Sequence, residues 1–105
     1  MSEGKYIGDV EINGELIEVF EHNYQHGGKI GIVGVTKQGE PFGTFSINVE
    51  DAGLQGDEFI FPEYKLSSLP DIKEGMLRSK HFMDTGRKAS FGYVANQPIL
   101  TLVRH

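Results

Sequence analysis

The dipeptide Asn13-Gly14 lies between two strand-like runs, and it constrains the fold of this chain more than any other feature. Residues 5–12 (KYIGDVEI) precede it and residues 15–22 (ELIEVFEH) follow it. A two-residue type I′ turn needs positive φ at both central residues, which Asn and Gly adopt readily. The chain is therefore expected to begin with an antiparallel β-hairpin.

Short apolar runs separated by turn residues continue along the rest of the chain. Alternation is clean at 42–49 (FGTFSINV), where Phe45, Ile47 and Val49 share one face. In the run 29–37 (KIGIVGVTK), apolar residues occupy both the even and the odd positions, as in a central strand that is buried on both faces. Further strands are expected at 57–61, 87–95 and 99–103.

One helix is expected near residues 69–80. Ser68 is its predicted N-cap, and Pro70 fits the first helical turn. Ile72 and Met76 are spaced to form a buried stripe.

These elements predict an α+β fold. We expect a single domain over residues 1–105, with a mainly antiparallel sheet of six to seven strands, curled or split, hairpins first, and one helix near residues 69–80 packed on one face. Parallel pairing is not expected because crossover helices are missing. The strand order stays open, and Asn96-Gln97-Pro98 either turns the chain or bulges one long edge strand.

Size and composition exclude several classes of protein. A chain of 105 residues is long enough for one packed core without a covalent staple. The absence of Cys excludes disulfides, thiolate nucleophiles and Cys-ligated zinc. The first residues contain no apolar segment, and no apolar run reaches membrane-spanning length, so we expect neither a signal peptide nor membrane insertion. The expected location is cytoplasmic.

Acidic and basic residues are segregated along the chain. Residues 1–64 carry twelve Asp/Glu and three Lys, a balance of −9, whereas residues 65–105 carry seven Lys/Arg and three Asp/Glu, a balance of +4. The two halves sum to the net charge of −5. Such asymmetry predicts a directional field that steers charged partners.

The first hairpin is the leading candidate for a partner-binding surface, because its carboxylates suit a basic groove on another protein. The alternative is that these charges only keep an edge hairpin from pairing with other molecules. The candidate residues are Asp9, Glu11, Glu15, Glu18, Glu21, His22, Tyr24 and His26.

A basic region with aromatic neighbours is the alternative site. Basic and aromatic side chains together can hold single-stranded nucleic acid, although a net charge of −5 does not favour it. A small ligand or nucleic acid is the corresponding partner. The simplest role for these charges is to neutralise the acids of the N-terminal hairpins. The residues are Arg78, Lys80, Arg87 and Lys88.

No pattern for catalysis, metal binding or a cofactor is convincing. His22 and His26 are four residues apart, but they lie near a glycine loop rather than on a helix, so their spacing fixes no metal geometry. The segment 27–34 (GGKIGIVG) lacks the Gly-Lys-Ser/Thr ending of a phosphate loop. No nucleophile elbow is present. We therefore expect no metal, no cofactor and no enzymatic activity.

Short motifs in a fixed order also suggest a family. They are Glu21-His22-Asn23-Tyr24 with Gly27-Gly28, then Gly39-Glu40-Pro41-Phe42 leading into Ser46-Ile47-Asn48-Val49, then Asp84-Thr85-Gly86-Arg87 with Gly92 and Pro98. From about residue 14 onward, the chain resembles a small, uncharacterised bacterial domain family of unknown function found in mobile elements and phage-like regions. The segment 62–75 departs from the family's pattern. The resemblance implies an α+β fold and an intracellular accessory protein, and it supplies no catalytic residues.

Together these observations predict a non-enzymatic interaction protein. It would be an accessory or anti-defence factor of a phage or mobile element, with the acidic hairpin as its binding surface.

Overall fold

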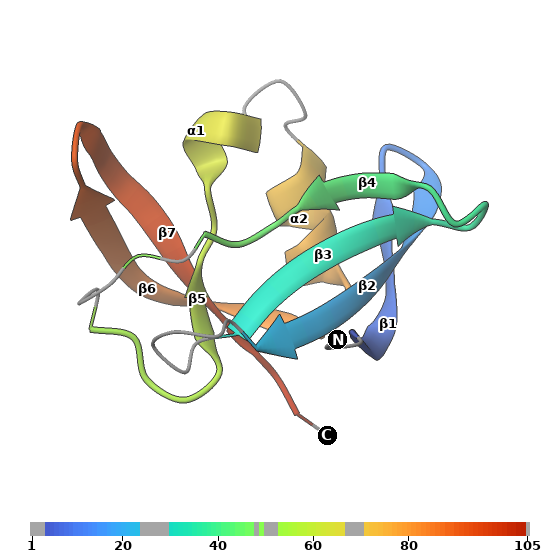
Figure 1. Ribbon diagram of the computed structural model, residues 1–105, viewed down its shortest axis with the longest axis horizontal. Coiled ribbons are helices and arrows are strands. Elements are labelled where there is room, and N and C mark those ends of the chain that lie inside the picture. The colour runs from blue at the N-terminus through green and yellow to red at the C-terminus, as the bar shows by residue number, and fades with distance from the viewer. Residues whose placement is uncertain (1–3, 24–29, 48, 50–52, 67–70, 105) are drawn as a thin grey trace.

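The computed structural model describes residues 4–23, 30–47, 49, 53–66 and 71–104, and the structural statements below concern these residues. They form one small domain of seven strands, in two antiparallel sheets, with two short helices (Figure 1). The elements are β1 (Lys5–Ile12), β2 (Glu15–Asn23), β3 (Ile30–Thr36), β4 (Pro41–Thr44), β5 (Glu58–Ile60), α1 (Glu63–Leu66), α2 (Asp71–Arg78), β6 (Phe82–Phe91) and β7 (Val94–Leu102).

The hairpin predicted at Asn13-Gly14 is confirmed. Ile12 pairs with Glu15, so the turn contains two residues, and their φ angles are 52° and 82° as a type I′ turn requires. The Asn13 N–H also donates to a carboxylate oxygen of Asp71 at 3.0 Å. The hairpin tip is thereby attached to the first turn of α2.

The strands lie in two sheets, ordered β1-β2-β3-β4 and β5-β7-β6, so the expected sheet of six to seven strands is split into one sheet of four strands and one of three. The predicted strand 42–49 is where the two sheets part. Phe45 still donates its N–H to the Ile32 carbonyl at 2.8 Å, but Ile47 pairs with Ile60 of β5. One apolar segment therefore passes from the first sheet to the second. The alternation of apolar and polar residues along the segment does not reveal the change of sheet.

The core lies between the inner faces of the two sheets. Ile17 and Ile32 of the first sheet are fully buried, as are Phe59 and Leu100 of the second. The Phe59 and Phe82 rings meet edge to face, with centroids 5.7 Å apart. Figure 1 shows the four-stranded sheet on the right and the three-stranded sheet on the left, with α1 at the top.

The helix α2 lies against β1, and Gly75 sets their separation. A Cβ at this position would overlap the carbonyl oxygen of Glu11, and it would lie 3.2 Å from Cγ1 of Ile12. Ile72 and Met76 are buried in the core, as the predicted stripe requires. Glycine weakens a helix interior by about 1 kcal/mol relative to Ala, but here it permits close packing on the sheet.

The helix predicted near residues 69–80 corresponds to α2, but the described residues also contain a second, shorter helix. The described helix α2 is eight residues long, and the four-residue helix α1 precedes it. Ser68 and Pro70, the predicted N-cap and first-turn residues, lie outside the described residues.

The last two strands form one long hairpin, and of the two alternatives left open for Asn96-Gln97-Pro98 the structure shows the bulge rather than the turn, in a central rather than an edge strand. Phe91 pairs with Val94, so the chain turns at residues 92–93, and Asn96 instead lies at an irregularity in β7 with φ of 58°. Pro98 lies inside β7, between β5 and β6. It has no N–H to donate, but its carbonyl accepts from Phe61 at 2.9 Å just after β5 ends. A proline that is expected to break a strand is accommodated where the neighbouring strand stops.

Candidate functional site

The outer face of the four-stranded sheet points away from the second sheet. Val10 and Ile17 lie inward, so their chain neighbours project outward. The strand register places Asp9 opposite Glu18 on this outer surface. We call the following residues the outer acidic face: Tyr6, Asp9, Glu11, Leu16 and Glu18.

Two large apolar side chains stand exposed among these carboxylates. Leu16 is 49% exposed and lies opposite Glu11, and Tyr6 is 52% exposed. The Tyr6 ring packs against the Phe20 ring across the strand pair, with centroids 5.5 Å apart. The outer acidic face therefore combines apolar contact area with negative charge.

Lys37 connects the two central carboxylates of this face. Its Nζ lies 2.8 Å from Asp9 and 3.3 Å from Glu18. The Tyr6 hydroxyl donates to the other Asp9 oxygen at 2.7 Å. The hydrogen bonds from Lys37 and Tyr6 hold the pKa of Asp9 below its ordinary value. Asp9 is thus ionised and held in one orientation.

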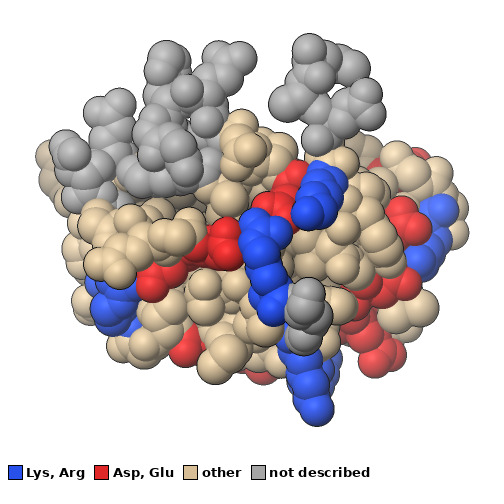
Figure 2. Space-filling model, turned by 90° about the horizontal axis from the view of Figure 1, so that it is seen from below, with Lys and Arg blue, Asp and Glu red and all other residues tan. Residues whose placement is uncertain are grey.

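Further carboxylates lie near the turns at one end of the sheet. Glu11, Glu15 and Glu40 make no ion pair within the described part of the chain. Figure 2 shows acidic side chains gathered on the right, the side of the four-stranded sheet. The charge of this end is therefore only partly neutralised by Lys37.

The other predicted hairpin residues are placed differently. Glu21 lies on the inner face, 9% exposed, and is bound to Arg104, so it is not part of the outer surface. His22 faces outward, and its ring covers Gly31 of β3. Tyr24 and His26 lie outside the described residues.

Arg104 links the four-stranded sheet to the three-stranded sheet. Its Nη1 and Nη2 donate to the two Glu21 oxygens, each at 2.9 Å. Its Nε and Nη2 donate to Asp57 at 2.9 and 3.0 Å. These bonds hold the pKa of Asp57 below its ordinary value and raise that of Arg104. The last basic residue of the chain therefore clamps β2 to the segment before β5.

The predicted basic region does not form one free cationic patch. Arg78 pairs with Asp71 at 3.1 Å, and Arg87 pairs with Glu58. Lys80 follows α2 in a left-handed conformation, with φ of 66°, and Lys88 lies farther along β6. Figure 2 shows basic and acidic side chains side by side across the middle of that view. Arg87, like Arg104, thus neutralises an acid of the first half of the sequence, whereas Arg78 pairs with an acid of the second half.

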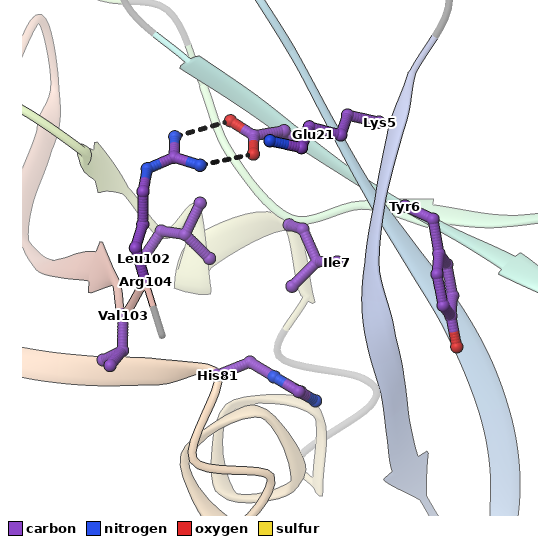
Figure 3. Close-up of a pocket in the computed structure, with 8 residues that line it drawn as sticks. All are labelled: Lys5, Tyr6, Ile7, Glu21, His81, Leu102, Val103 and Arg104. Carbon is purple, nitrogen blue, oxygen red and sulfur yellow. Dashed lines mark hydrogen bonds and ion pairs between the residues drawn. The ribbon is translucent and has the colours of Figure 1, made fainter.

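A cavity of about 290 Å³ opens beside the Arg104 clamp (Figure 3). It lies between the start of β1, the end of β7 and His81, which follows α2. Ile7 and Leu102 point toward one another across it, whereas Tyr6 points to the other side of β1 (Figure 3). The residues that line it are Lys5, Tyr6, Ile7, Glu21, His81, Leu102, Val103 and Arg104.

Sequence reasoning gave no role to Leu16, Tyr6 or Arg104. The exposure of Leu16 could have been predicted, because side chains alternate between the two faces of a strand and Leu16 lies on the face opposite to the buried Ile17 and Val19. The Arg104 clamp had no such signal, because its partners lie far away in the sequence.

Two further observations bear on the class of protein. Within the described ranges, no group of three His, Asp or Glu side chains is arranged to hold a metal ion. Nor does any described helix have the length and apolar character needed to cross a membrane.

Comparison with protein-family models, curated proteins and solved structures found no match to the chain.

Proposed function

We propose that this protein is a non-enzymatic binding domain whose outer acidic face docks on a basic surface of a protein partner. One observation carries the proposal. Tyr6 and Leu16 are each about half exposed, at 52% and 49%, beside Asp9, Glu11 and Glu18 on one regular sheet face.

This combination matches the composition of protein interfaces. Apolar and aromatic anchors supply most of the affinity at an interface, and surrounding charges supply orientation and association rate. Tyrosine is a favourable anchor because it contributes a large area while losing little rotamer entropy. Tyr6 is already held by Phe20 and Asp9, so binding costs it little further ordering.

The competing explanation is that the charges only protect an edge strand. β1 is an edge strand of its sheet, and charged residues on such strands discourage pairing with other molecules. Protection alone does not account for Leu16, which lies on the second strand and exposes an apolar side chain. Protection and docking therefore predict different effects when Leu16 is shortened.

The test is capture of a partner by the intact protein and by matched variants. Tyr6→Ala with Leu16→Ala should weaken capture by about tenfold or more, the effect of losing 1–2 kcal/mol at anchor positions. Tyr93→Ala is the control, because Tyr93 is fully exposed at the tip of the other hairpin. A variant of the outer acidic face that captures the partner as well as the Tyr93 control would contradict the proposal.

Charge is tested in the same way. Glu11→Lys should weaken capture, whereas Glu63→Lys should not, because Glu63 is an exposed residue of α1 without an ion pair among the described residues. Equal effects of the two substitutions would show that net charge rather than this face governs binding.

The alternative partner, a nucleic acid on the basic region, has weaker support. Arg78 and Arg87 are engaged with Asp71 and Glu58, which leaves Lys80 and Lys88 as its cations without an ion pair within the described ranges. The family resemblance favours an accessory or anti-defence factor of a phage or mobile element. Genes for defence proteins or mobile-element functions next to this one would support that role.

A further inference from the structure

The cavity beside Arg104 has an apolar wall and a polar rim. Ile7 and Leu102 face one another across it, Val103 also lines it, and Lys5 and Arg104 lie at the rim (Figure 3). Its volume of about 290 Å³ equals roughly ten water molecules, given that each occupies ~30 Å³ in the liquid. This is close to the lower end of the range for small-molecule sites.

The carboxylate at the rim is already paired. Each oxygen of Glu21 accepts one hydrogen bond from Arg104, which also donates to Asp57 behind it. A cation entering the cavity would have to compete with Arg104 for the Glu21 charge.

The donors at the rim retain capacity. A guanidinium has five N–H groups, and the four bonds from Arg104 leave one Nη1 N–H unused. Lys5 lies opposite Glu21 in the strand register, on the same inner face, and makes no ion pair with any residue that the structure describes. Its ammonium group keeps three N–H donors for an incoming acceptor.

We propose that this cavity binds a small anion, a carboxylate or phosphate carried on a compact apolar body. The anionic group approaches Lys5 Nζ and the remaining Nη1 N–H of Arg104 from the cavity side, beside the Glu21 carboxylate whose charge Arg104 neutralises (Figure 3). The apolar body contacts Ile7, Leu102 and Val103. This site is on the inner side of β1 and is separate from the outer acidic face, so it does not depend on the proposed protein partner.

The test is a titration of the intact ¹⁵N-labelled protein with three probes of similar shape. Binding is measured from the changes in the amide chemical shifts. Phenylacetate and phenyl phosphate carry the two anionic groups, and phenylacetamide is the neutral control. We expect saturable shifts at Ile7, His81 and Val103 with either anion, and dissociation constants in the millimolar range that suits a fragment of this size. The amide should bind about tenfold more weakly, because it lacks a charge-assisted hydrogen bond.

Variants assign the effect to the rim. Lys5→Gln should remove the preference for the anions while leaving the melting temperature unchanged, because Lys5 is exposed and has no ion pair among the described residues. Lys37→Gln, on the outer face, should keep the preference. Val103→Trp should fill the cavity and abolish binding of all three probes.

Two results would overturn the proposal, and neither depends on the Val103 variant folding. One is equal binding of phenylacetate and phenylacetamide to the unaltered protein. The other is the absence of saturable shifts at the cavity residues at millimolar concentrations of either anion.

Discussion

Replacement of Gly75 by Ala tests whether packing or helix propensity governs the contact between α2 and β1. Propensity alone favours the change, because Ala stabilises a helix interior by about 1 kcal/mol relative to Gly. The structure predicts the opposite sign. The new Cβ would overlap the Glu11 carbonyl oxygen and press on Ile12 at 3.2 Å, and a backbone atom in a paired strand cannot easily move away.

The magnitude follows from these opposing effects. Overpacking a buried site costs about 1–3 kcal/mol, and occasionally more when the backbone must shift. Moving α2 outward would also loosen Ile72 and Met76, which are 1% and 0% exposed. Because the overlap is with a backbone atom, the cost should lie in the upper part of this range, about 2–3 kcal/mol. After subtracting the gain in propensity of about 1 kcal/mol, we expect Gly75→Ala to destabilise the domain by about 1–2 kcal/mol. For a domain of this size, the melting temperature should fall by roughly 5–15 °C.

The assay is thermal and urea unfolding followed by circular dichroism. Glu74→Ala is the matched control, because Glu74 is the exposed neighbour on the same helix and its change should stay within about 0.5 kcal/mol. A rise in stability for Gly75→Ala would refute the close approach of α2 to β1.

Other predictions follow from the turn, the clamp and the histidines. Gly14→Val should cost about 1–2 kcal/mol, because φ of 82° disfavours a β-branched residue, and unchanged stability would contradict the turn. Arg104→Met should cost about 1–3 kcal/mol at pH 7 by leaving Glu21 without its partner. The lowered pKa of Asp57 gives stability that is present above its ordinary pKa and lost as the pH falls through that region, so this variant should lose less stability between about pH 7 and pH 3 in urea unfolding. Elemental analysis of protein purified without a tag should find no stoichiometric zinc, iron or copper; one metal per chain, lost on changing His22 or His26 to Ala, would overturn this expectation.

Local signals predicted much of the fold. The Asn13-Gly14 turn was predictable because the φ preferences of two adjacent residues determine it. The burial of Ile72 and Met76 was predictable because helical spacing places them on one face.

The sequence did not predict local structure correctly where that structure depends on pairing with a segment far away in the chain. The passage of 42–49 into the second sheet depends on Ile60, which pairs with Ile47. A turn and a bulge were both possible at Asn96-Gln97-Pro98, and the place of Pro98 beside the end of β5 removes the need for its N–H inside a central strand. These pairings join segments that no short pattern connects.

The candidate site shows the same division. Parity predicts that Asp9, Glu11 and Glu18 share a face, and the register agrees. The same alternation places Glu21 on the inner face of β2, with Ile17 and Val19, so its charge alone did not justify including it among the surface acids of the hairpin. Its burial is possible because Arg104, at the far end of the chain, supplies both hydrogen bonds to its carboxylate.

The association rate with a captured partner, measured at several ionic strengths, tests the central claim most directly. Docking through the outer acidic face predicts a rate that falls as salt rises, because salt screens electrostatic steering. Reversing Glu11 and Glu18 to Lys should slow association and flatten this dependence more than it speeds dissociation. Reversing Lys80 and Lys88 to Glu should leave the rate nearly unchanged. The claim is contradicted if the lysine variant controls affinity while the acidic variant has no effect, and retention of DNA or RNA by the protein would then favour the basic region as its site.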